Sequence, residues 1–215
     1  MNKKIFIISL IFNSILIVGI FIVFFLNQTN NSINNNVVKI VKESEIVKND
    51  DNPKGIFGDE KNLDKNILSG LFINKNTIIT AAHGVNNTDS IYEIYDKIGN
   101  KYDAKLIKKD TINDYAILEI NIDFKNFKKI NIEKNINIGE EIYQFGYNET
   151  NNDFKMKKGT ITKINGNKIT TNIVFLEGNS GSPIYNKNND LIGIAIEVDE
   201  KNNVGYFLKI SDFVN

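Results

Sequence analysis

The chain has 215 residues, which is enough for one folded domain with a sizeable core and too few for two large domains. Its 26 basic and 26 acidic side chains balance, so no global field favours nucleic acid or a highly charged partner. There are no cysteines, which excludes disulfides, thiolate metal sites and a cysteine nucleophile. Partners must therefore be inferred from local sites, and a nucleic acid is not expected among them.

The N-terminal segment has the character of a membrane anchor. An apolar run over residues 5–26 has few interruptions and is long enough to cross a bilayer as a helix. It ends without the small-residue cleavage site of a signal peptide. Lys3 and Lys4 precede it, so the positive-inside rule places the N-terminus in the cytoplasm. We expect residues 1–27 to form a cytoplasmic stub and a single-pass transmembrane anchor in the cell membrane, with the rest of the chain extracytoplasmic.

Residues 28–54 are rich in Asn and charged side chains, as expected of a flexible linker that cannot build its own core. One short apolar patch, residues 37–41, interrupts this segment. The sequence leaves open whether the patch adds an edge strand or a packing segment to the folded domain. The folded domain itself is expected over residues 55–215.

From residue 55 onward the chain has the pattern of an all-β domain. Short runs rich in Ile, Val, Phe, Tyr and Thr alternate with clusters of Asn, Gly, Asp and Lys, a pattern typical of barrels and sandwiches. The expected strands fall into two groups, about residues 55–130 and 135–215, which suggests two similar half-domains. These strands are 68–73, 77–81, 91–95, 103–107, 116–120, 141–145, 156–164, 168–174, 182–185, 191–197 and 204–208.

His83 is the only histidine, and it follows the apolar strand expected over residues 77–81. Any mechanism that needs an imidazole base near neutral pH must use it. The alternative is a surface or capping histidine at a strand end. Small residues in Thr80-Ala81-Ala82-His83 weaken that alternative, because they leave room for the ring in a packed interface.

Asp114 directly precedes the apolar strand expected over residues 116–120. An aspartate there would accept a hydrogen bond from the imidazole, fix its tautomer and stabilise the imidazolium. The alternative is an ordinary turn residue at a strand start. Asp110 is the competing candidate for the same role.

The motif Gly178-Asn179-Ser180-Gly181-Ser182-Pro183 has the form of a turn that exposes a nucleophilic serine. Its glycines let the backbone bend tightly, so that the Ser180 hydroxyl is exposed while backbone N–H groups converge on one point. The N–H groups of Gly178 and Ser180 would then form an oxyanion hole. Taken alone, such a cluster is more often an ordinary turn.

Together, these motifs resemble those of the trypsin-like serine peptidases, and their order along the chain matches that family. The ending Ser-Gly-Ser-Pro and the residues after it most resemble the bacterial glutamyl endopeptidase and exfoliative-toxin branch, with the HtrA-like group next. The matching segments are Ser69-Gly70-Leu71-Phe72-Ile73, Thr80-Ala81-Ala82-His83, Asp114-Tyr115-Ala116-Ile117-Leu118 and Gly178-Asn179-Ser180-Gly181-Ser182-Pro183.

The resemblance covers about residues 55–213 and implies two six-stranded antiparallel β-barrels with an active site between them. It implies a serine endopeptidase that acts on polypeptides through an acyl-enzyme, with His83, Asp114 and Ser180 as the triad and no metal or organic cofactor. Asn179 stands where zymogen-activated relatives have an aspartate that pairs with a freed N-terminal amine. Activation by N-terminal clipping is therefore not expected.

The resemblance also places the substrate pocket. Val174 and Phe175 fall near its base, and Ala195 falls where glutamyl endopeptidases have a histidine. Glu197 and Val198 fall at its mouth, where relatives often have glycines, and would narrow it. With no acid at the base and no histidine at residue 195, we expect a small apolar side chain in the pocket rather than Arg, Lys or Glu. The alternative function is a catalytically inactive pseudoprotease that acts as a binding module, its pocket blocked by Phe175 or Glu197. A further alternative is a membrane-tethered adhesin or structural β-domain in which the motifs are coincidental.

Overall fold

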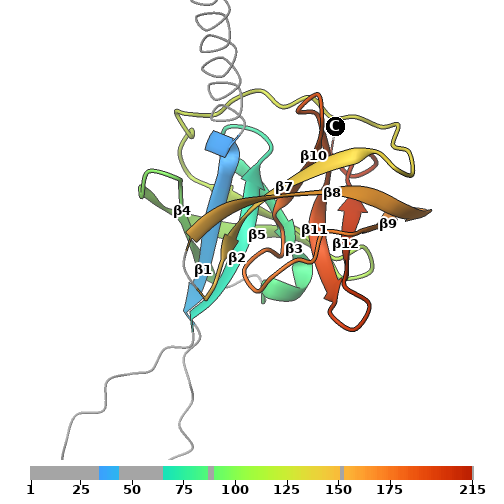
Figure 1. Cartoon of the computed structure of the whole chain (residues 1–215). Helices are drawn as coiled ribbons and strands as arrows, with labels where there is room; N and C mark the ends of the chain where they lie inside the picture. The colour runs from blue at the N-terminus through green and yellow to red at the C-terminus, as the bar shows by residue number, and fades with distance from the viewer. Residues whose placement is uncertain (1–33, 44–64, 87–89, 151–152, 215) are drawn as a thin grey trace, which may run out of the picture. The chain divides into compact units, whose positions relative to one another are not determined.

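The computed structural model describes residues 34–43, 65–86, 90–150 and 153–214 (Figure 1). The predicted anchor, and most of the predicted linker, lie outside these residues. Within the described ranges, no helix has both the length and the apolar character needed to cross a bilayer. The described chain forms strands, with short 3-10 turns at Asn34–Asn36 and Ala82–Gly84.

The first barrel closes in the antiparallel order β1-β2-β3-β6-β5-β4. Alternate side chains of each strand point inward, as the burial along β4 shows: Tyr92 and Ile94 are buried and Ile91 is exposed. Phe72 and Phe124 stack at the centre of this core with ring centroids 4.3 Å apart. The strands are β1 (Val37–Glu43), β2 (Lys65–Phe72), β3 (Thr77–Ala81), β4 (Ile91–Tyr95), β5 (Lys101–Asp110) and β6 (Tyr115–Ile120).

Strand β1 is the apolar patch that the sequence placed inside the linker. It pairs with β2 on one side and with β4 on the other, so it closes the barrel. Val38 and Ile40 are fully buried in the core. Just before it, Asn36 exchanges two hydrogen bonds with the backbone of Lys128, at 2.5 and 2.9 Å. The folded unit therefore begins before residue 55, and residues 37–43 belong to the barrel.

The second barrel closes in the antiparallel order β10-β11-β12-β9-β8-β7. The predicted all-β fold of two six-stranded antiparallel barrels is thus confirmed. The core of this barrel contains Ile142, Ile161, Ile169, Ile184, Ile192 and Phe207, all essentially buried. Its strands are β7 (Glu141–Asn148), β8 (Asp153–Asn165), β9 (Lys168–Thr171), β10 (Pro183–Asn186), β11 (Leu191–Asp199) and β12 (Val204–Lys209).

Ser69 of β2 joins the first barrel to the loop between β9 and β10 of the second. Its N–H donates to the carbonyl of Ser180 at 2.9 Å, and its hydroxyl donates to the carbonyl of Gly178 at 2.8 Å. The same hydroxyl accepts from the N–H of Tyr147 at 2.9 Å. Because Ser69 is completely buried, these bonds fix the loop that carries Ser180 against the first barrel.

Candidate active site

His83 lies in the 3-10 turn that follows β3 in the first barrel. Strand β3 is rich in β-branched residues and pairs along its length with β6. The turn is tied to residue 114 through the backbone: the N–H of Ala82 donates to the Asp114 carbonyl at 3.2 Å, and the N–H of His83 donates to Asp114 Oδ1 at 2.8 Å. The position of the ring is therefore set by the neighbouring loop as well as by its own strand.

Asp114 occupies the last position of the β5–β6 turn, with a φ of 55°. This left-handed conformation is tolerated by aspartate, and the preceding turn holds it in place. Asp110 accepts hydrogen bonds from the N–H groups of Ile112 and Asn113 and from the Asn113 side chain. These contacts lower the pKa of Asp110, and both oxygens of its carboxylate are bound within the turn. The structure thus brings Asp114, and not the competing Asp110, to His83.

The three predicted side chains form one continuous hydrogen-bonded chain. Oδ2 of Asp114 lies 2.8 Å from Nδ1 of His83, and Nε2 of His83 lies 2.9 Å from Oγ of Ser180. With the proton on Nδ1, the ring donates to the carboxylate and accepts from the serine hydroxyl. The hydrogen bond that His83 donates to Asp114 raises the pKa of His83; burial opposes this effect, and the charges of Asp114 and Glu197 reinforce it.

The turn around Ser180 depends on two glycines with positive φ, Gly178 at 88° and Gly181 at 82°. A Cβ on Gly178 would lie 2.7 Å from the backbone nitrogen of Glu149. That nitrogen donates its N–H to the Glu177 carbonyl at 3.0 Å, and in a trans peptide the Gly178 N–H then points the opposite way. Among the described residues, neither the Gly178 nor the Ser180 N–H has a hydrogen-bond partner. The loop therefore offers two unused donors beside the serine hydroxyl.

Asn179 locks this turn from within. Its Oδ1 accepts from the N–H of Leu176 at 2.9 Å, and its Nδ2 donates to the carbonyl of Tyr147 at 2.7 Å. The side chain is almost completely buried. The neutral amide of Asn179 thus satisfies both a donor and an acceptor of the surrounding backbone, which an aspartate at this position could not do.

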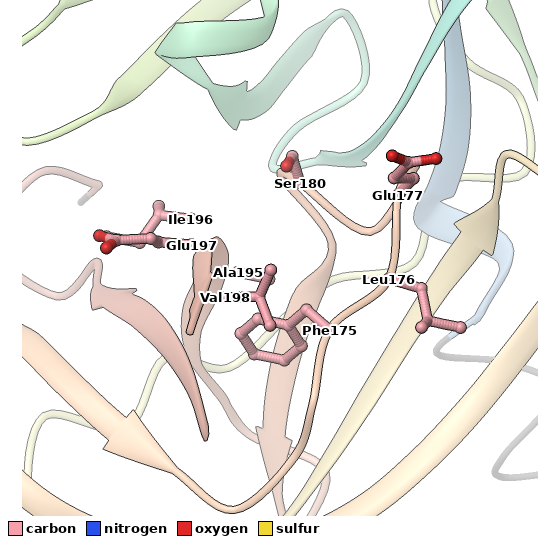
Figure 2. A pocket seen from close by; sticks show the side chains of 8 residues that line it. All are labelled: Phe175, Leu176, Glu177, Ser180, Ala195, Ile196, Glu197 and Val198. Atoms are coloured by element: carbon pink, nitrogen blue, oxygen red, sulfur yellow. The ribbon is translucent and has the colours of Figure 1, made fainter. Parts of the chain in front are cut away.

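A pocket of about 140 Å³ opens next to Ser180 (Figure 2). Four of the predicted pocket residues line it, namely Phe175, Ala195, Glu197 and Val198. Val174 does not; its carbonyl instead accepts a hydrogen bond from Lys157 Nζ at 2.7 Å. The lining residues that the sequence did not indicate are Leu176, Glu177 and Ile196. All of these flank predicted pocket residues or the serine motif, and that proximity is the signal that would have found them.

A Ser–His–Asp hydrogen-bonded chain between two β-barrels, beside free backbone donors and a pocket, is the arrangement found in serine hydrolases of the double-barrel class. The chain belongs to the trypsin-like peptidase family, since the family model described as "Trypsin-like peptidase domain" matches residues 68–194.

The fold is similar to that of a serine endoprotease from Yersinia pestis known from its crystal structure. The TM-score is 0.68 and the sequence identity 23% over 86% of this chain. The match covers 62% of the other chain, so this chain spans less than two thirds of that protein. At this identity the likeness shows the fold. Neither comparison separates the branches of the family, so the glutamyl endopeptidase and exfoliative-toxin branch stays a prediction.

Proposed function

We propose that this protein is a serine endopeptidase that hydrolyses peptide bonds with Ser180 as nucleophile. The observation that carries the proposal is the distance of 2.9 Å between His83 Nε2 and Ser180 Oγ, with Asp114 on the other ring nitrogen. A serine hydroxyl is a weak nucleophile until a neighbouring base accepts its proton. Here the base is within reach and its orientation is fixed by the carboxylate.

The reaction would proceed through an acyl-enzyme. Ser180 Oγ attacks the carbonyl carbon of the scissile bond while its proton passes to His83 Nε2. The negative charge on the carbonyl oxygen is held by the N–H groups of Gly178 and Ser180. The C–N bond then breaks, and the leaving amine takes the proton from His83. A water molecule then gives a proton to His83 Nε2 and attacks the ester. The carboxylic product leaves, and Ser180 Oγ takes the proton back from His83.

The pocket favours a short apolar side chain on the residue whose carbonyl is attacked. Phe175, Ala195 and Val198 supply apolar lining, and the pocket volume of about 140 Å³ is small. A charged side chain in this apolar interior would lose its hydration beside apolar neighbours alone, because the two glutamates of the lining, Glu177 and Glu197, lie at the mouth. This preference supports the expectation that neither Arg, Lys nor Glu enters the pocket.

We also propose that residues 5–26 anchor the enzyme in the cell membrane, with the protease domain on the extracytoplasmic side. The support is the length and apolar character of this run and the lysines before it. Membrane fractionation followed by digestion of intact cells with an added protease tests the topology. A protein that stays soluble, or one protected in intact cells, contradicts the proposal.

Hydrolysis of peptides tests the catalytic proposal. The full chain in detergent micelles is incubated with a library of peptides, and products are identified by mass spectrometry beside a Ser180→Ala control. Cleavage after small apolar residues by the wild type alone is the expected result. A folded wild type that binds peptides without cleaving them favours the inactive binding module instead.

A further inference from the structure

Two carboxylates rim the pocket beside the serine. Figure 2 shows Glu177 and Glu197 on opposite sides of the pocket, with Ser180 at its edge and the apolar side chains of Phe175 and Val198 between them. Both glutamates are exposed. The pocket therefore has an apolar interior and an acidic mouth.

Glu197 is held at this mouth by an ion pair with Lys168. The ammonium also lies 4.3 Å from the centroid of the Tyr206 ring, and Tyr206 pairs with Glu197 across β11 and β12. The side chains of the pair are about half exposed, at 46% for Lys168 and 53% for Glu197. Independently, the charge of Glu197 acts on the pKa of His83, so the carboxylate lies within electrostatic reach of the triad.

Glu177 stands on the other side and has no ion-pair partner among the described residues. Its backbone position is fixed, because its carbonyl accepts the N–H of Glu149 and the preceding N–H, that of Leu176, is bound by Asn179. It directly precedes Gly178, the first of the two N–H donors that face the reacting carbonyl. A substrate residue next to the scissile bond must therefore pass close to this carboxylate.

We infer that Glu177 and Glu197 select peptides in which a Lys or Arg residue flanks, within two positions, the short apolar residue that fills the pocket. The inference rests on the proposed function. The apolar interior excludes a cation from the pocket itself, while the partly shielded rim attracts one beside it and repels Asp and Glu. Lys168 weakens this preference, because it neutralises part of the charge of Glu197.

A set of quenched fluorescent peptides tests the inference. The peptides share one apolar residue at the pocket position and differ only in carrying Lys, Gln or Glu at the flanking positions. The readout is the ratio of kcat/KM for the Lys peptide to that for the Glu peptide. A change in the pKa of His83 affects both peptides equally, so this ratio isolates recognition from chemistry.

The wild type is expected to prefer the Lys peptide. Glu177→Gln and Glu197→Gln are each expected to lower the ratio by about two- to fivefold, the range of a single exposed charge pair. Lys168→Gln is expected to raise the ratio, and added salt to reduce it. Glu200→Gln, an exposed glutamate in the β11–β12 turn, is the matched control and is expected to change nothing.

The outcomes separate this inference from the function on which it rests. If the wild type cleaves the peptides but the ratio is unaffected in both glutamate variants, or if it prefers the Glu peptide, the acidic rim does not select substrates and the endopeptidase proposal stands. If the folded wild type cleaves no peptide and its serine reacts with no fluorophosphonate, both proposals are overturned.

Discussion

The ring of Phe175 lies against the backbone of Gly205, so closely that a Cβ built on the glycine would come within 2.7 Å of ring atom Cε2. Phe175 is 4% exposed and belongs to the core of the second barrel, yet it also lines the pocket next to Ser180. Because Gly205 has no side chain, the Phe175 ring can pack against its backbone. In this position the ring limits the depth of the pocket.

Replacement of Phe175 should therefore enlarge the substrate pocket. We expect Phe175→Ala to shift the preferred pocket residue from Ala or Val towards Leu or Phe, measured as kcat/KM on a peptide series. The cavity should also lower the free energy of unfolding by about 3–5 kcal/mol, measured by denaturant titration. Phe175→Leu is the milder companion if the alanine variant does not fold. An unchanged preference in a folded variant would show that this ring does not set the pocket depth.

The pH dependence of catalysis should follow the raised pKa of His83. The imidazole must be neutral to accept the serine proton, so kcat/KM rises with pH through this pKa. Because Asp114 raises it, the midpoint of the acidic limb is expected above the ordinary value of 6.5. Asp114→Asn should move the limb to lower pH and reduce kcat by several orders of magnitude. Asp110→Asn is the control and should leave the midpoint of the acidic limb unchanged. If the midpoint is the same in Asp114→Asn as in the wild type, Asp114 does not have the assigned role.

The neutral amide of Asn179 should be required for a competent serine loop. Asn179→Asp keeps an acceptor for the N–H of Leu176 but places a second acceptor against the Tyr147 carbonyl in a buried site. We expect this change to lower the free energy of unfolding by about 1–3 kcal/mol and to reduce kcat/KM. Asn179→Ala loses both bonds and should behave similarly. Wild-type stability and activity in both variants would show that the loop holds without them.

Strand β1 should be indispensable to the fold. Removal of residues 1–33 leaves β1 in place, and a cooperative denaturation transition is expected to remain. Removal of residues 1–44 deletes β1, opens the edges of β2 and β4, and takes Val38 and Ile40 out of the core. The longer deletion is expected to give aggregated or unfolded protein. Equal stability of the two truncated chains would place β1 outside the folding unit.

The strands and the three chemical motifs could be predicted from sequence because each is encoded locally. Alternation of apolar and polar residues marks a strand, and the tight serine turn needs glycines next to it. The sequence favoured Asp114 over Asp110 but could not decide between them. The difference lies in the geometry of the turn, in which Asp110 accepts hydrogen bonds from its own loop and Asp114 binds His83.

Features that depend on tertiary pairing could not be predicted. The patch that forms β1 is short and lies in a polar segment, and its partners are found only when the barrel closes. The strand predicted over residues 168–174 ends at Thr171 in the structure. Ile173 and Phe175 lie in the loop that follows, and their side chains are buried. Loop geometry likewise leaves Val174, expected at the base of the pocket, out of its lining and brings Glu177 to its rim. Neither position follows from the periodic pattern of a strand.

Fluorophosphonate labelling shows directly whether Ser180 is an activated nucleophile, because the probe reacts covalently with a serine activated by a neighbouring base. The full chain in detergent is treated at about pH 8, where an imidazole is largely neutral, and the intact mass and the modified peptide are measured. We expect one label per chain, located on Ser180, and none in Ser180→Ala or His83→Ala. A folded wild type that takes up no label, or a label that persists in Ser180→Ala, would contradict it.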